Sequence, residues 1–277
     1  MRFQMIFSLL CLLPSCGLQS RDKIFNDVSK SRDYEKIGEI DVPEGFQRLD
    51  ADENSFGNWL RNVHLRKDKR VFLYNGVLKK NQEAQFAVLN EKVGDKDLQQ
   101  CADAIIRLRA EYFFSKKQYD SIHFKATDGT TMSFADWQHG KRYHLVGNRL
   151  SVSFNADHSD KTESNFENFL ETVFRYAGTA SLASELSPVS SIGELRPGDV
   201  FIKPGFPGHA MLIVDVCSNK SGKKLFMLAQ SYMPAQDIHI VKNPMNEELS
   251  PWYEVNDNVN IYTPEWTFTI DQLKRWH

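Results

Sequence analysis

Residues 195–202 read LRPGDVFI, and residues 208–215 read GHAMLIVD. A Pro-Gly-Asp turn opens the first stretch, and a Gly-His pair opens the second. Apolar runs of this length, bounded by turn residues, predict two buried strands joined by a short loop. Gly208 has no side chain, so another group can approach the backbone closely there. An imidazole at the start of a long apolar strand is unusual, and it makes His209 a candidate functional residue.

Further strands are predicted on either side of this pair. The polar residues 218–222, Ser-Asn-Lys-Ser-Gly, predict a hairpin that leads from the 209–216 strand into a strand over 224–231. The other segments with strand character are 71–78 (interrupted by Asn75-Gly76), 85–89, 122–124, 131–134 and 238–241.

The first two thirds of the chain contain the clearest helices. Apolar residues in 98–113 recur every three or four positions, and they place Cys101 on one buried stripe. With Asp95 or Asp97 as the N-cap, Cys101 lies four to six positions into this helix. A second amphipathic helix is predicted over 165–176, and a short one after Asn54-Ser55. Helices early and strands late predict an α+β fold rather than alternating α/β.

The composition is that of an ordinary globular protein. The chain has 277 residues, 41% of them hydrophobic, with 34 Lys and Arg against 36 Asp and Glu. These values exclude a collagen, a coiled-coil rod, a disordered chain and a polytopic membrane protein. The absence of a basic excess argues against a nucleic-acid partner, because nothing would neutralise the phosphates. No repeat or linker divides the chain, so one domain is expected.

The N-terminus predicts export rather than structure. Its apolar run, residues 6–13, is far shorter than the roughly 20 residues of a membrane-spanning helix, and it fits a secretory signal. The sequence LPSC that ends at Cys16 resembles a bacterial lipobox, in which cleavage precedes a cysteine that becomes lipidated. We therefore expect a signal peptide over 1–15, a lipidated tether over 16–37 and a single α+β domain over 38–277. The alternative is an ordinary signal peptide with Cys16 as a bystander.

This reading places the domain at the bacterial cell envelope, in the periplasm or outside the cell, with membrane lipid as a partner through the acyl anchor. No nucleotide-binding loop, nucleophile elbow or metal-spaced set of His and Cys occurs in the sequence, so neither a cofactor nor a metal is expected.

Geometry limits which residue can orient His209. Asp215 lies six residues further along the same strand, about 20 Å away, so it cannot contact the imidazole. The predicted hairpin brings Gln230, Ser231 or Tyr232 opposite His209, and a one-residue change of register decides among them. We favour Gln230, because its amide carbonyl can accept the imidazole N–H and select one tautomer.

Three interpretations of Cys101 follow from the sequence. A cysteine in an apolar helical stripe is commonly a small core residue. With His209 as its base it would be a nucleophile. In an oxidising envelope it could instead form a disulfide with Cys217. The last two exclude each other, because Cys217 lies eight residues along the strand from His209, about 26 Å away.

The strand half of the chain resembles the NlpC-type and CHAP-type cysteine peptidases, which are papain-like cell-wall amidases. In those families a Pro-Gly-Asp strand precedes the strand that begins with the catalytic His, and the nucleophilic Cys starts an earlier helix. The resemblance implies that Cys101 and His209 are catalytic, and that a helix packs on an antiparallel sheet or partial barrel. The usual Ser after the nucleophile is absent, since Ala102 follows Cys101.

A second resemblance covers most of the predicted domain. It is carried by residues 97–104 (DLQQCADA), 108–112 (LRAEY), 229–236 (AQSYMPAQ), 251–253 (PWY) and 263–266 (TPEW). These segments are similar to those of bacterial lipoproteins grouped as domain of unknown function 4846. This resemblance implies no activity.

Taken together, the sequence predicts an envelope lipoprotein that acts as a cysteine hydrolase or transferase on amide bonds, such as those of peptidoglycan peptides. Cys101 is the expected nucleophile, His209 the base and Gln230 its orienting residue, while backbone N–H groups with Gln99 or Gln100 hold the oxyanion. The alternative is a non-catalytic envelope lipoprotein with a structural or binding role.

Overall fold

The structure is a computed structural model that describes residues 33–154, 162–255 and 259–277. The predicted signal peptide, Cys16 and the tether up to residue 32 lie outside the described residues. Residues 33–277 form one compact unit, in which Tyr34 already stacks on Phe86 and Ile37 is fully buried. Among the described residues, no helix combines the length and apolar character required to cross a membrane.

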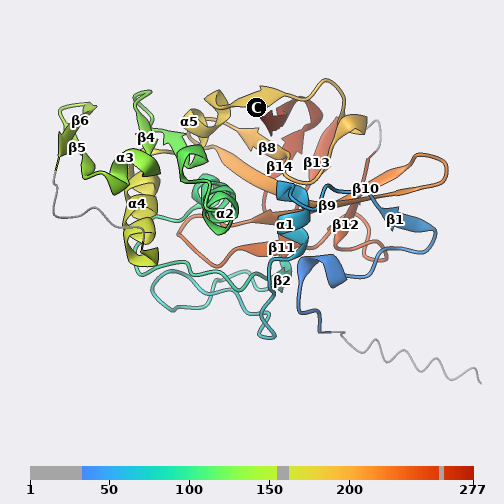
Figure 1. The fold of residues 1–277 in the computed structure, drawn as a ribbon. Coiled ribbons are helices and arrows are strands. Elements are labelled where there is room, and N and C mark those ends of the chain that lie inside the picture. Colours follow the sequence, from blue (N-terminus) through green and yellow to red (C-terminus); the bar gives the residue numbers. More distant parts are fainter. Residues whose placement is uncertain (1–32, 155–161, 256–258) are drawn as a thin grey trace, which may run out of the picture. The chain divides into compact units, whose positions relative to one another are not determined.

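A large antiparallel sheet forms the centre of this unit (Figure 1). Its main strands run in the order β2 (Gln85–Val88), β11 (His239–Val241), β10 (Lys224–Gln230), β9 (His209–Asn219), β8 (Val200–Lys203), β15 (Leu273–Trp276) and β7 (Leu186–Pro188). The ends of the long β9–β10 hairpin gain two more partners: β1 (Phe46–Arg48) pairs with the end of β9, and β12 (Trp252–Glu254) pairs with the start of β10.

The apolar run of β9 reflects burial on both faces of the sheet. Ala210 and Leu212 belong to a core cluster shared with the helices, whereas Met211 and Ile213 belong to a second cluster on the opposite face. A strand that is covered on both sides gains hydrophobic burial from every side chain, so it need not alternate with polar residues.

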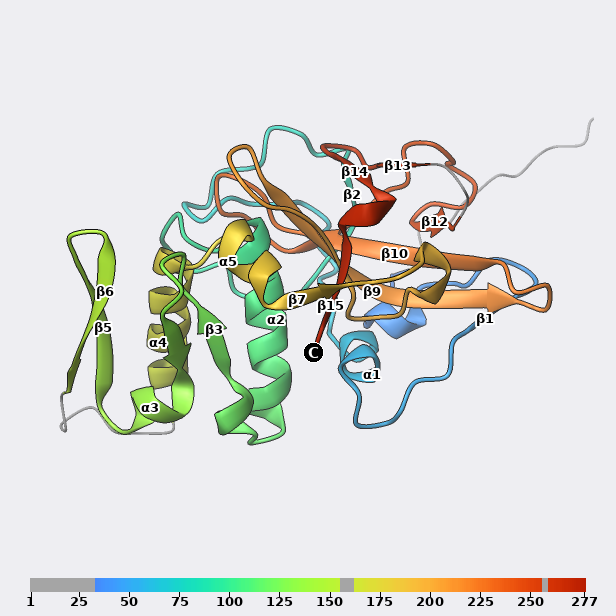
Figure 2. The same ribbon diagram turned by 90° about the horizontal axis from the view of Figure 1, so that it is seen from above.

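In the described part of the chain, five α-helices accompany the sheet: α1 (Phe56–Arg61), α2 (Cys101–Ser115), α3 (Phe134–Gln138), α4 (Glu163–Tyr176) and α5 (Thr179–Ser184). The longest, α2, packs directly against β9 and also contacts α4 and α5 (Figure 2). This contact brings the start of α2 to the strands that the sequence singled out.

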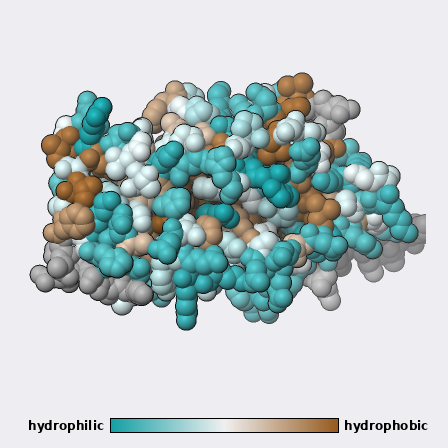
Figure 3. Space-filling model, turned by 45° about the horizontal axis from the view of Figure 1, so that its top comes forward, coloured by the Kyte–Doolittle hydropathy of each residue, from teal (hydrophilic) through white to brown (hydrophobic). Residues whose placement is uncertain are grey.

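The remaining elements are short. They are the hairpins β3 (His123–Lys125) with β4 (Thr131–Ser133), β5 (Lys141–Val146) with β6 (Arg149–Phe154), and β13 (Asn260–Tyr262) with β14 (Thr267–Thr269), and the 3-10 helices η1 (Ile37–Glu39), η2 (Tyr119–Ser121), η4 (Ile192–Glu194) and η5 (Ile270–Gln272). The β5–β6 hairpin exposes the apolar side chains of Leu145, Val146, Val152 and Phe154, and it lies at the left edge of Figure 3, where brown surface is visible.

The predicted α+β class, the β9–β10 hairpin and the two long helices are confirmed. Two predictions of local structure are wrong. Residues 71–78 form only isolated bridges, Phe72 with Leu78 and Leu73 with Gln236, because the Asn75-Gly76 turn leaves too few residues on either side for a ladder. The helix predicted over 98–113 begins at Cys101 instead of Leu98, for the capping reason given below.

Candidate functional site

The three predicted site residues occupy the ends of three elements. Cys101 is the first residue of α2, His209 the first of β9 and Gln230 the last of β10. Packing of α2 against β9, together with pairing of β9 and β10, brings these ends to the same part of the molecule.

The position of Cys101 in the helix differs from the expectation of four to six residues inside. Gln100 is the N-cap, and its backbone N–H donates to Asp103 Oδ2 across 3.1 Å. This bond satisfies one of the N–H donors that the start of a helix leaves free, so the helix begins at Cys101. The cysteine therefore lies in the first turn, where the helix dipole favours negative charge most strongly.

The surroundings of Cys101 both raise and lower the pKa of its thiol. Its residue is 6% exposed, and burial, followed by the nearby charge of Asp103, raises the pKa of the thiol to about 11. Hydrogen bonds from the backbone N–H groups of Ala210, Ala102 and Cys101 itself act in the opposite direction. The group is thus a neutral thiol at pH 7, with its sulfur beside the residue that follows His209.

The imidazole of His209 lies in an aromatic enclosure. Its ring centre is 4.6 Å from that of Tyr232, 5.2 Å from Trp266 and 5.8 Å from Phe268. Burial lowers the pKa of His209 to about 4, a hydrogen bond to Gln230 raises it, and the charge of Lys79 lowers it. His209 is therefore neutral at pH 7, the state in which it can accept a proton.

Gln230 is the residue that hydrogen-bonds to His209, since its Oε1 lies 2.8 Å from His209 Nε2. A register shift between Met227 and Leu228 sets this arrangement. Tyr232 packs against the same imidazole with its ring tilted by 55°, whereas Ser231 Oγ donates to the carbonyl of Gln99, 3.0 Å away. Of the three alternatives left open by the sequence, Gln230 and Tyr232 both contact His209, and Gln230 is the one that forms a hydrogen bond with it.

Sequence reasoning missed the residues behind Gln230. Its Nε2 donates to Glu265 Oε2 across 2.8 Å, and Glu265 forms an ion pair with Lys79 at 2.5 Å. His239 Nε2 lies 3.3 Å from Gln230 Nε2 and 3.4 Å from Lys79 Nζ. Glu265 lies in one of the segments that carry the family resemblance, but no sequence spacing connects it to Gln230. No motif or periodic pattern in the sequence pointed to Lys79 as a site residue.

A cavity of about 290 Å³ lies beside Cys101. Residues at the start of α2 form one wall, and Gly178 and Thr179 form another. Fully exposed Phe206 and half-exposed Met233 also line it, so apolar side chains flank the approach to the thiol.

The close approach predicted at Gly208 is present in the loop between β8 and β9. A Cβ at this position would lie 2.4 Å from the carbonyl oxygen of Gly205 and 2.6 Å from Thr179 Oγ1. Only glycine fits here without displacing the loop or α5, and this loop leads directly into His209.

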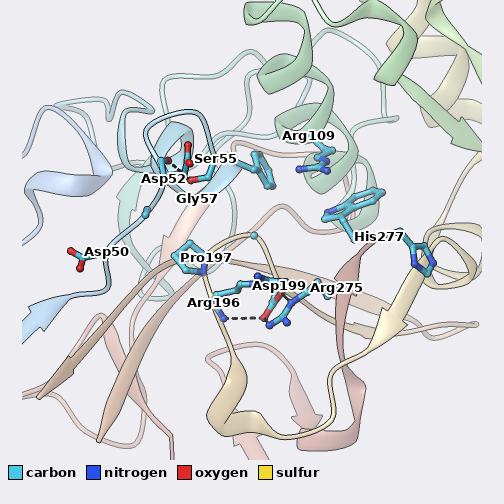
Figure 4. Close-up of a pocket in the computed structure, with 14 residues that line it drawn as sticks. Asp50, Asp52, Ser55, Gly57, Arg109, Arg196, Pro197, Asp199, Arg275 and His277 are labelled. Carbon is cyan, nitrogen blue, oxygen red and sulfur yellow. Dashed lines mark hydrogen bonds and ion pairs between the residues drawn. The ribbon is translucent and has the colours of Figure 1, made fainter. Parts of the chain in front are cut away.

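The Pro-Gly-Asp turn lies at a separate cavity of about 360 Å³, which Figure 4 shows. Buried Asp199 accepts two hydrogen bonds from Arg275 there, at 2.6 and 2.7 Å, and it also accepts one from the backbone N–H of Arg196. Arg109 lies across this cavity, with its guanidinium carbon 4.5 Å from the centre of the Phe113 ring. Asp199 therefore anchors the turn to β15 and makes no contact with the predicted catalytic residues.

Asp215 and Cys217 have structural surroundings. Asp215 is buried and pairs with Arg48 and Arg61, in agreement with its exclusion as the residue that orients His209. Cys101 and Cys217 are both free thiols, so the disulfide alternative is wrong. Over the described ranges, no cluster of three or more His, Cys, Asp or Glu side chains is placed to hold a metal ion.

These features define an α+β protein in which a histidine and an amide form a hydrogen bond at one end of the central strands, and a cysteine at a helix N-terminus lies beside the same strand. Residues 37–275 match the family described as Domain of unknown function (4846), and the chain belongs to this family. Searches among curated proteins and among solved structures found no match. The family resemblance is confirmed, whereas these comparisons lend no support to the resemblance to papain-like peptidases.

Proposed function

We propose that the protein is a cysteine hydrolase or acyltransferase of the cell envelope that acts on amide bonds, such as those of peptidoglycan peptides. The observation that carries this proposal is the 2.8 Å contact of His209 Nε2 with Gln230 Oε1, beside a cysteine in the first turn of α2. The N-terminal sequence, with its short apolar run and Cys16, supports the envelope location and the lipid anchor.

The reaction begins from a neutral pair. As the sulfur of Cys101 attacks the amide carbonyl carbon, His209 Nδ1 takes the thiol proton and a C–S bond forms. The imidazolium then gives this proton to the amide nitrogen as the C–N bond breaks, so an amine leaves and a thioester remains. Water gives hydrolysis of the thioester, and a second amine gives transfer.

The first turn of α2 supplies donors for the developing oxyanion. Helix N-terminal N–H groups point toward such a charge and stabilise it. Gln99 adds a side-chain candidate, because its Oε1 is held by Arg107 while its buried Nε2 has no partner among the described residues. The amide of Gln100 instead donates to Asp97 Oδ1 across 3.1 Å. Of the two predicted glutamines, Gln99 therefore suits the oxyanion role better.

A second candidate function is a non-catalytic binding or structural role. Burial favours it, because Cys101 and His209 are both almost inaccessible and both are neutral. A packed thiol of this kind reacts slowly with any electrophile.

Thiol labelling discriminates between these functions. We expect iodoacetamide to modify Cys101 of the folded protein faster than Cys217, and His209→Ala to slow labelling of Cys101 at least about tenfold, because the base is lost. Peptide mapping by mass spectrometry assigns the rate to each cysteine. His139→Ala is the matched control, since His139 is exposed and lies at the C-cap of α3. Equal rates for Cys101 and Cys217, or no effect of His209→Ala, would favour the non-catalytic role.

A further inference from the structure

We propose that Glu265, Lys79 and His239 fix the direction of every hydrogen bond around Gln230, and that they thereby hold His209 as the Nε2–H tautomer. The catalytic consequence of this tautomer rests on the proposed function, but the assignment of the tautomer itself does not. These three residues are then positioning residues, which act on the reaction only through Gln230 and His209.

The first constraint is Glu265. Its carboxylate only accepts hydrogen bonds, and it forms an ion pair with Lys79 at 2.5 Å. Asn81 Nδ2 adds a further donor to Glu265 Oε1 at 3.2 Å. The atom of Gln230 that lies 2.8 Å from Glu265 Oε2 must therefore be the amide nitrogen.

The second constraint is His239. Its Nδ1 lies 2.9 Å from the carbonyl oxygen of Asp237, which only accepts, so Nδ1 carries the proton. His239 Nε2 then carries no proton and acts as an acceptor. Both Lys79 Nζ and Gln230 Nε2 are within hydrogen-bonding distance of its lone pair. With one N–H directed at Glu265 and the other at His239, both protons of the Gln230 amide are used.

Gln230 Oε1 is thus the only polar atom of this side chain left to face His209, and it accepts the proton of Nε2–H across 2.8 Å. His209 Nδ1 is left with its lone pair, which the proposed reaction requires. Turning the amide over would place its carbonyl oxygen against two other acceptors, the Glu265 carboxylate and the lone pair of His239 Nε2. Burial makes this costly, because Gln230 is 1% exposed and water cannot replace the lost hydrogen bonds.

Nitrogen NMR of the full chain with ¹⁵N-labelled histidine tests the ordering directly. We expect a pyrrole-type Nε2 and a pyridine-type Nδ1 for His209, and the reverse for His239. The two rings are assigned from the signals that disappear in His209→Gln and His239→Gln. A proton on His209 Nδ1 in the wild-type protein would overturn the proposal, and this measurement on the wild type requires no substitution.

Glu265→Gln removes the group that only accepts and allows both orientations of the Gln230 amide. We expect the second His209 tautomer to become detectable and Cys101 alkylation to slow about three- to tenfold, the effect of losing one net hydrogen bond. Glu254→Gln is the matched control, because Glu254 pairs with Lys223 at 2.8 Å on β12 and has no contact with His209. Unchanged tautomers and an unchanged rate in Glu265→Gln would overturn the positioning role.

The two proposals fail in different ways. The predicted tautomers with an unreactive Cys101 would overturn the hydrolase and leave the ordering intact. A reactive Cys101 together with Nδ1–H at His209 would overturn the ordering and leave the hydrolase intact.

Discussion

His209 and His239 are buried neutral histidines on either side of the Gln230 amide, and their environment determines what the site can do. Burial lowers the pKa of His209 to about 4 and that of His239 to about 3. Since the thiol is neutral as well, the site holds no preformed thiolate and imidazolium pair. In the proposed reaction, charge would appear only as the sulfur attacks, at the first turn of α2, where backbone N–H groups can stabilise it.

The lowered pKa of His209 predicts a loss of stability in mild acid. Between the ordinary value of 6.5 and about 4, the unfolded chain binds a proton that the folded chain does not. The contribution of neutral His209 to the free energy of unfolding is therefore complete at a pH above 6.5, the pKa in the unfolded chain, and it is lost as the pH falls from 6.5 to about 4. It amounts to roughly 3 kcal/mol.

Urea unfolding of the wild type and His209→Gln measures this contribution. Asp103, with its raised pKa, has the opposite slope, so the quantity to compare is the difference between the two proteins. We expect the wild type to lose more free energy of unfolding than the variant between about pH 7 and about pH 5. An equal loss in the two proteins would contradict the burial of a neutral His209.

At the scale of elements, the loop between β8 and β9 and the start of α2 decide where the catalytic candidates lie. The β8 and β9 strands could be predicted because each contains an unbroken apolar run, Val200–Ile202 in β8 and Ala210–Val214 in β9. The start of α2 could not, since Gln100 is an uncommon N-cap and several acidic residues precede it. Only the hydrogen bond between Asp103 and the backbone N–H of Gln100 shows which polar residue is the N-cap, where the helix begins.

Gly208→Ala should destabilise the protein by about 2 kcal/mol, because the added methyl group overlaps a backbone oxygen 2.4 Å away. It should also slow Cys101 labelling, since His209 is the next residue. Gly193→Ala is the control, because its Cβ would meet only Ser191 Oγ, at 3.5 Å. Thermal unfolding and labelling rates compare the two variants, and equal stability would show that the loop accommodates a side chain.

At the scale of the whole molecule, buried Asp215 joins segments that are distant in the sequence. Arg48, the last residue of β1, and Arg61, the last of α1, both donate to it, at 2.6 and 2.7 Å. The ion pairs therefore hold the first part of the described chain on β9. Two arginines on one carboxylate make the charge balance of this site depend on all three groups.

Arg61→Ala should lower the free energy of unfolding by about 3 kcal/mol, because it removes half of the compensation of a buried carboxylate and leaves the carbonyl of Leu49 without its donor. Arg70→Ala is the control, since Arg70 pairs with Asp68 at the exposed surface, and it should leave stability essentially unchanged. Denaturant unfolding compares the two. A similar effect in both variants would show that Asp215 does not tie these segments together.

The sequence by itself determined the α+β class, the β9–β10 hairpin, the prominence of His209 and the membership of family 4846. It also excluded Asp215 as the partner of His209. These results follow from signals that act over a few residues, such as apolar runs, turn chemistry and the rise per residue. Tertiary structure alone decided that Gln230, rather than Ser231 or Tyr232, forms the hydrogen bond with the imidazole, and that Gln230 in turn contacts Glu265, which pairs with Lys79. The physical reason is that one shift in register, between Met227 and Leu228, and the packing of segments far apart in the chain set these contacts, and neither leaves a periodic trace in the sequence.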